Sequence, residues 1–113
     1  MRYRKPYDAL EVYINAEIVA GDENRIDIVA NDIRRYLNCC WGVENINVDT
    51  DDFEYNEAAD KDSKGGIVDG TLHVHFYAYY VESEWTPLDI LGQVESTIQA
   101  LNPRRIATEY YED

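Results

Sequence analysis

Apolar residues recur at two spacings along this chain, and each spacing predicts an element. Every second residue from position 10 to 18 is apolar, which is typical of a strand with one buried face. The apolar residues of this strand are Leu10, Val12, Ile14, Ala16 and Ile18. A helical spacing then runs from Ile26 to Trp41, and Gly42 stands where a helix C-cap glycine is common.

The rest of the chain repeats this alternation of strand and helix signals. A second strand is expected from Val43, and a shift in its apolar phase before Phe53 predicts a β-bulge near Asp51 and Asp52. The polar stretch 56–66 predicts a mobile hairpin loop. Further signals predict a strand over 71–80, a helix opened by Thr86-Pro87, and a last strand over 104–111.

The predicted element order is βαββαβ, without an internal linker, so residues 1–113 are expected to form a single domain. This order resembles the ferredoxin-like superfold over nearly the whole chain. The resemblance implies an α+β fold, a two-layer sandwich with an antiparallel sheet and both helices on one face. Because this superfold carries many unrelated functions, function has to be argued from sites.

Charge is the most unusual feature of the composition. The chain has 23 acidic residues against 10 Lys and Arg, a formal net charge of -13. Such a balance argues against direct nucleic-acid binding, which needs cations on phosphates, and against adhesion to anionic lipid. No apolar run reaches the length of a membrane-spanning helix, and the adjacent Cys39 and Cys40 are expected to be buried thiols. We therefore expect a cytoplasmic protein.

The acidic residues concentrate between Glu44 and Asp62. On a strand, successive outward residues stand roughly 6.5–7 Å apart, close to the phosphate spacing along one DNA strand. Carboxylates in such a row can occupy Arg and Lys sites built for phosphate. The alternative interpretation is that a charged edge strand prevents aggregation.

Tyrosine and histidine form a second candidate surface on the outward side of the third predicted strand. Its residues are His73, His75, Tyr77 and Tyr79, and Tyr13 of the first predicted strand faces the same way. The basic and glycine positions of RNA-recognition strands are absent, which argues against base stacking. Tyr is enriched at protein interfaces, so the alternative to RNA is that a protein partner or a second copy of the chain binds this face. His73 and His75 project to one side of a strand and could bind one metal ion, although no other ligand spacing or catalytic motif accompanies them.

In size, charge and the interleaving of Tyr with acid, the sequence resembles the small acidic inhibitors encoded by phages and mobile elements, anti-CRISPR proteins and other DNA mimics. The residues that carry this likeness lie in the run 49–57 and the tail 109–113. The resemblance implies a non-enzymatic inhibitor without a cofactor, acting in the host cytoplasm on a basic nucleic-acid-binding site of a nuclease or CRISPR-type complex.

The predicted partner-binding residues are Glu44, Asp49, Asp51, Asp52, Glu54, Tyr55, Glu57, Tyr77 and Tyr79. Two other hypotheses stay open. One is a structural or assembly protein, such as a virion component or homodimer, that uses the tyrosine face. The other is a metal- or ligand-binding protein that uses His73 and His75.

Overall fold

Two long antiparallel strands form the centre of the structure, a computed structural model that describes residues 9–20, 23–40, 42–56, 67–79 and 87–112. Strands β1 (Ala9–Ala20) and β4 (Ile67–Tyr79) pair from Ala9↔Tyr79 to Ala20↔Val68 without interruption. Strand β5 (Arg105–Glu112) pairs with the other edge of β1. Strands β2 (Val43–Asp49) and β3 (Glu54–Asn56) lie one after the other along β4, so the sheet order is β2-β4-β1-β5.

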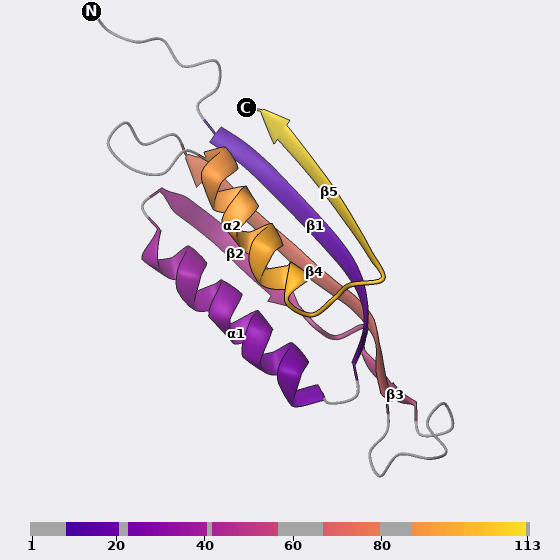
Figure 1. Cartoon of the computed structure of the whole chain (residues 1–113). Coiled ribbons are helices and arrows are strands. Elements are labelled where there is room, and N and C mark those ends of the chain that lie inside the picture. The colour runs from indigo at the N-terminus through magenta and orange to yellow at the C-terminus, as the bar shows by residue number, and fades with distance from the viewer. Residues whose placement is uncertain (1–8, 21–22, 41, 57–66, 80–86, 113) are drawn as a thin grey trace, which may run out of the picture.

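Both helices cover the same face of this sheet (Figure 1). Helix α1 (Glu23–Cys39) and helix α2 (Pro87–Gln99) bury the apolar stripes that the sequence predicts. The molecule is therefore α+β and has two layers, as expected. The fully buried side chains at its centre include Leu10, Ile14, Ile33, Phe76 and Ile98. Burial of each stabilises the fold by about 1.5–3 kcal/mol relative to exposure.

The helix ends also follow the sequence signals. Gly42 follows α1 with a φ of 77°, the left-handed conformation that glycine adopts readily, and its carbonyl accepts from Tyr79 N at 2.7 Å. Helix α2 begins at Pro87, which is favoured in the first turn. Asn102, with a φ of 52°, ends the turn after α2 just before Pro103. Trp41 and Thr86 lie outside the described residues.

The second predicted strand differs from expectation, because it is split in two. Strand β2 ends at Asp49, and a turn closed by Phe53 N donating to Thr50 O at 3.2 Å separates it from β3. The bulge predicted near Asp51 and Asp52 is therefore wrong: those residues form this turn. An irregularity does occur, but earlier, where the β2–β4 register shifts between Glu44 and Asn47.

Cys39 is exposed at the end of α1 and Cys40 is half-buried, so the expectation that both thiols are buried is wrong for Cys39. The loop predicted over 56–66 lies outside the described residues from position 57 onward. No helix in the described part of the chain is long and apolar enough to cross a membrane.

Candidate functional site

The face of the sheet opposite the helices carries the polar half of every strand, and we call it the open face. Directly opposed residues in an antiparallel pair lie on the same face, so the register defines its members. Strands β1 and β4 contribute Glu11, Tyr13, Asn15, Glu17, Asp69, Thr71, His73, His75, Tyr77 and Tyr79. Strands β2, β3 and β5 contribute Glu44, Asn47, Asp49, Glu54, Arg105, Ala107, Glu109 and Tyr111.

Four rings at the centre of the open face form what we call the aromatic cluster: Tyr13, His75, Tyr77 and Tyr111. Tyr13 stacks on His75 with ring centroids 4.3 Å apart and planes 15° apart. Tyr111 meets Tyr13 edge-on at 6.0 Å, and Tyr77 meets His75 edge-on at 5.6 Å. Edge-on and offset-stacked pairs are the favourable geometries for aromatic rings. The cluster thus joins β5, β1 and β4 across their outward side.

Glu11 is the hydrogen-bond acceptor of this cluster. The Tyr13 hydroxyl donates to Glu11 Oε2 at 2.7 Å, and His75 Nε2 lies 3.0 Å from the same oxygen. The hydrogen bond from Tyr13, followed by those from His75 and Tyr77, lowers the pKa of Glu11, because each donor stabilises the ionised carboxylate. The bond to Glu11 in turn raises the pKa of Tyr13 to about 12. This half-buried carboxyl is therefore held in its charged form.

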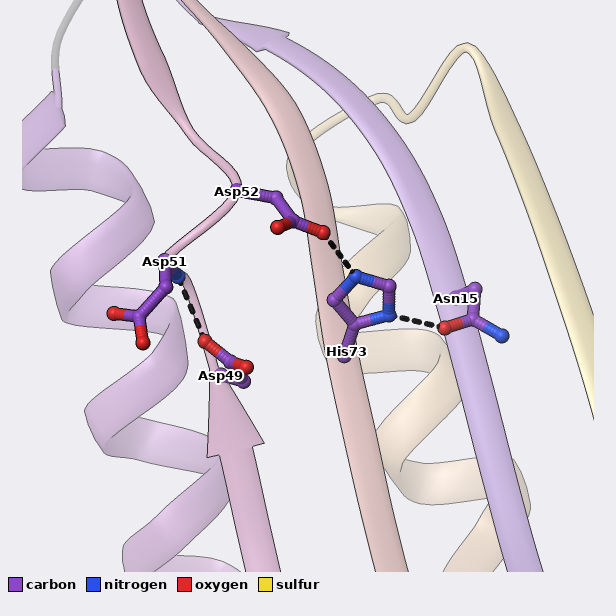
Figure 2. A network of polar contacts seen from close by, with 5 residues as sticks. All are labelled: Asn15, Asp49, Asp51, Asp52 and His73. Atoms are coloured by element: carbon purple, nitrogen blue, oxygen red, sulfur yellow. Dashed lines mark hydrogen bonds and ion pairs between the residues drawn. The ribbon is translucent and has the colours of Figure 1, made fainter.

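A second polar network lies further along β4 and β1 (Figure 2). His73 Nε2 contacts Asp52 Oδ2 at 2.5 Å, and His73 Nδ1 contacts Asn15 Oδ1. A neutral imidazole donates to one of these oxygens, whereas an imidazolium donates to both. Nearby, Asp51 N donates to Asp49 Oδ1 at 2.7 Å, a local turn contact typical of Asp. The network ties the turn between β2 and β3 to the two central strands.

Acidic residues from all five strands and from the turn share this side of the molecule. They are Glu11, Glu17, Glu44, Asp49, Asp52, Glu54, Asp69 and Glu109. At the register positions of the open face that the structure describes, the cation is Arg105, which lies 3.9 Å from Glu17. In the other layer, Arg25, Arg34 and Arg35 of α1 are balanced by three acidic residues on the same helix. The two layers therefore differ in charge.

The predicted residues are only partly brought together. Glu44, Asp49, Tyr77 and Tyr79 lie on the open face, and Glu54 is opposite Asp69 at its far end. Asp52 reaches the face through His73, but Asp51 is an exposed turn residue. The continuous row of carboxylates along the second strand is thus wrong, because that strand ends at Asp49. Tyr55 is paired with Val68 through the backbone, and Glu57 lies outside the described residues.

The predicted partner-binding residues leave out six acidic or tyrosine residues that the register places on the open face: Glu11, Glu17, Tyr13, Asp69, Glu109 and Tyr111. The outward half of the alternation in β1 was a signal for the first three. Glu109 and Tyr111 lie in the tail 109–113 that the sequence singled out, but their place on this face depends on how β5 is aligned against β1. The acidic surface is consequently wider than the single edge strand that the sequence suggested.

The geometry does not favour a shared metal site at His73 and His75. The ring nitrogens of His73 face Asn15 and Asp52, whereas Nε2 of His75 faces Glu11. Within the described ranges, no three His, Cys, Asp or Glu side chains are grouped so that they could hold a metal ion. What the open face offers instead is carboxylates for cations and exposed rings for stacking.

Comparison with known proteins adds information on the fold alone. No protein-family model matches the sequence, and no curated protein matches it. A solved structure of the de novo designed protein Foldit4 is similar, with a TM-score of 0.53 over 91% of this chain and 98% of that chain. At 17% sequence identity, this likeness shows a shared arrangement of helices and strands.

Proposed function

We propose that this chain is a non-enzymatic inhibitor of the DNA-mimic kind, whose acidic open face occupies a basic nucleic-acid-binding site on another protein. The observation that carries the proposal is the gathering of carboxylates from all five strands on one face. The helix layer is less acidic, because the three arginines of α1 offset the three acidic residues of that helix and α2 adds only Asp89 and Glu95. A one-sided field of this kind steers a basic partner toward one surface.

The residues on this face suit arginine in particular. A carboxylate accepts both arms of a guanidinium, as a phosphate does. Exposed rings give the same guanidinium a surface for stacking, and Tyr13, Tyr79 and Tyr111 are 36%, 38% and 54% exposed. Glu11 lies opposite Tyr111 and is held ionised by hydrogen bonds from Tyr13, His75 and Tyr77. Charge and stacking would thus act on one partner side chain together.

The proposal extends to fold type and target class. The order β2-β4-β1-β5, with both helices on one face, supports a ferredoxin-like topology in which β3 continues the second strand. The target we propose is a host nuclease or CRISPR-type complex in the cytoplasm, because such proteins hold nucleic acid in basic channels. The chain would act stoichiometrically, as a phage or mobile-element protein.

The test is affinity capture from nuclease-treated host lysate, with bound proteins quantified by mass spectrometry. The test variant is Asp49→Asn/Asp52→Asn/Glu54→Gln, which removes three charges of the open face, from β2, the turn and β3, and leaves amide acceptors in place. The matched control is Asp27→Asn/Asp32→Asn/Asp89→Asn, which removes three exposed charges from the helix layer. We expect a nucleic-acid-binding protein that wild type and control retain and the test variant loses.

Two further measurements make the result specific. Double-stranded DNA should compete with the chain for the captured protein, because both would occupy one site. Retention should fall steeply as salt rises, since screening acts within about 10 Å at 0.1 M. Equal retention by the test variant, or capture that DNA does not compete, would refute the mimic function.

A further inference from the structure

The two edges of the sheet are not equally protected against pairing with another strand. At one edge, the register of β2 shifts between Glu44 and Asn47, and Asn45 has a φ of 54°. Bulges of this kind commonly hinder an edge strand from pairing with a strand of another chain. At the other edge, β5 keeps an unbroken register with β1 from Arg105↔Glu17 to Leu10↔Glu112. Within the described part of the chain, β1 is the only strand that pairs with β5.

Charge divides β5 into two unlike halves. Arg104 and Arg105 stand at its start, and Glu109 stands in its second half. A strand with this pattern is complementary to itself when two copies run antiparallel, since the basic start of one then meets the acidic half of the other. A parallel arrangement would place like charges together, which is unfavourable.

The second half of β5 also exposes two adjacent large rings. Tyr110 is 47% exposed and Tyr111 is 54% exposed. They lie on opposite sides of the strand, because Tyr110 is opposite the buried Val12 and Tyr111 is opposite Glu11. A neighbouring strand at this edge would cover part of both rings at once, whereas a partner docked on one face would reach only one.

We propose that β5 is a homodimerisation edge, which pairs antiparallel with β5 of a second copy about a two-fold axis at Thr108. This axis keeps the helices of both copies on one side of a continuous sheet. It sets Ile106 opposite Tyr110 of the second copy on the helix side. On the open face it sets Arg105 opposite Tyr111 and diagonal to Glu109 of the second copy. Opposed side chains stand about 4.5–5.5 Å apart and diagonal ones about 7–8 Å apart, within reach of Arg and Tyr.

Sedimentation velocity over a concentration series tests this edge. Wild type should dimerise. Arg105→Glu or Glu109→Arg should each raise the dissociation constant of the dimer by about tenfold or more, because each substitution alters two symmetry-related contacts. The double variant Arg105→Glu/Glu109→Arg should recover most of the lost affinity. Glu44→Arg, at the opposite edge of the sheet, should dimerise like wild type. Circular dichroism confirms that each variant is folded.

The register is tested separately by disulfide trapping. In a Cys39→Ser/Cys40→Ser background, Thr108→Cys should form an intermolecular disulfide on oxidation, whereas Asn47→Cys on β2 should not. A wild type that stays monomeric throughout the series overturns the proposal. The proposal also fails if the single charge reversals leave the affinity of the dimer unchanged, or if the folded double variant does not regain affinity. Equal yields of intermolecular disulfide at positions 47 and 108 would overturn it as well. The proposal does not depend on the inhibitor function, which is tested by other residues.

Discussion

At the scale of single residues, Gly70 is set by close contact with another part of the backbone. It lies on β4 opposite Ile18, where the turn after β2 crosses the strand. A Cβ at this position would stand 2.6 Å from Asp52 O and 2.6 Å from Phe53 Cα. Only glycine allows the turn to lie this close.

We therefore expect Gly70→Ala to lower the free energy of unfolding by about 1–3 kcal/mol, the usual cost of overpacking. The matched control is Gly92→Ala on α2, where a Cβ would have no neighbour within 4 Å. That change should instead stabilise the protein by about 0.5–1 kcal/mol, because alanine has a higher helix propensity than glycine. Urea unfolding of both variants checks the pair, and a Gly70→Ala variant as stable as wild type would contradict the described turn.

The hydrogen bond between Tyr13 and Glu11 makes a prediction about pH. It raises the pKa of Tyr13 from 10.0 to about 12 and lowers the pKa of Glu11 from 4.5. For Tyr13 the folded pKa exceeds the unfolded one, so this stabilisation is present below pH 10 and is lost as the pH rises through about 12. For Glu11 the folded pKa is the lower one, so stabilisation is present above pH 4.5 and is lost as the pH falls through the folded value.

Glu11→Gln should bring the pKa of Tyr13 down toward 10, as followed by the ¹³C shift of the Tyr13 Cζ atom during an alkaline titration. Glu109→Gln is the control. Glu109 accepts a hydrogen bond from the Tyr111 hydroxyl at 2.9 Å and raises the pKa of Tyr111. Glu109→Gln should therefore lower the pKa of Tyr111 and leave the pKa of Tyr13 near 12. A Tyr13 titration that Glu11→Gln does not alter would refute this contact.

At the scale of elements, the edge strand β2 depends on one residue in an unusual conformation. Asn45 has a φ of 54°, in the left-handed region, and lies inside the register shift between Glu44 and Asn47. Asn tolerates this region better than other residues with a Cβ, and a β-branched residue is disfavoured there. The irregularity lets Glu44 and Asp49 share the open face, although their spacing in a regular strand would place them on opposite faces.

Asn45→Val should therefore lower the free energy of unfolding by about 1–2 kcal/mol, whereas Asn45→Gly should be close to neutral. Thermal and urea unfolding compare the two variants. The same pair of substitutions at the exposed Asn47 serves as the control, where Val should be tolerated better than Gly because that position lies in strand. Equal stability of Asn45→Val and Asn45→Gly would argue against the bulge.

At the scale of the whole molecule, the carboxylates of the open face repel one another. The formal net charge of -13 is large for 113 residues, and much of it is gathered on one side of the sheet. Such self-repulsion opposes the compact state, and dissolved salt screens it.

Stability toward urea should therefore rise with NaCl, by about 1 kcal/mol between 0.01 and 0.5 M, as the screening length shrinks from about 30 Å to a few ångströms. The variant Asp49→Asn/Asp52→Asn/Glu54→Gln should show a smaller rise, because fewer like charges remain. A protein whose stability falls with added salt would indicate that attractive pairs outweigh the repulsion.

The elements and the buried faces of this protein follow from local periodicity and could be predicted from the chain. The alternation in β1 and β4 and the helical spacing in α1 and α2 name the buried side chains, because burial of one face follows directly from a period of 2 or 3.6 residues. The helix stop at Gly42 was likewise readable from the chain. These features suffice to predict the α+β class and the two-layer arrangement.

The arrangement of the open face depends on contacts between strands that are distant in the sequence. Glu11 meets His75 across 64 positions of the chain, and His73 meets Asp52 across 21. Contacts between residues this far apart in the sequence depend on strand register. The phase shift before Phe53 marks the interruption of the second strand but does not distinguish a bulge from a turn, and the bulge at Asn45 leaves no clear periodic signal. Local pattern specifies which side of a strand is buried. The pairing of distant strands specifies which polar side chains become neighbours, and so which surface the molecule presents.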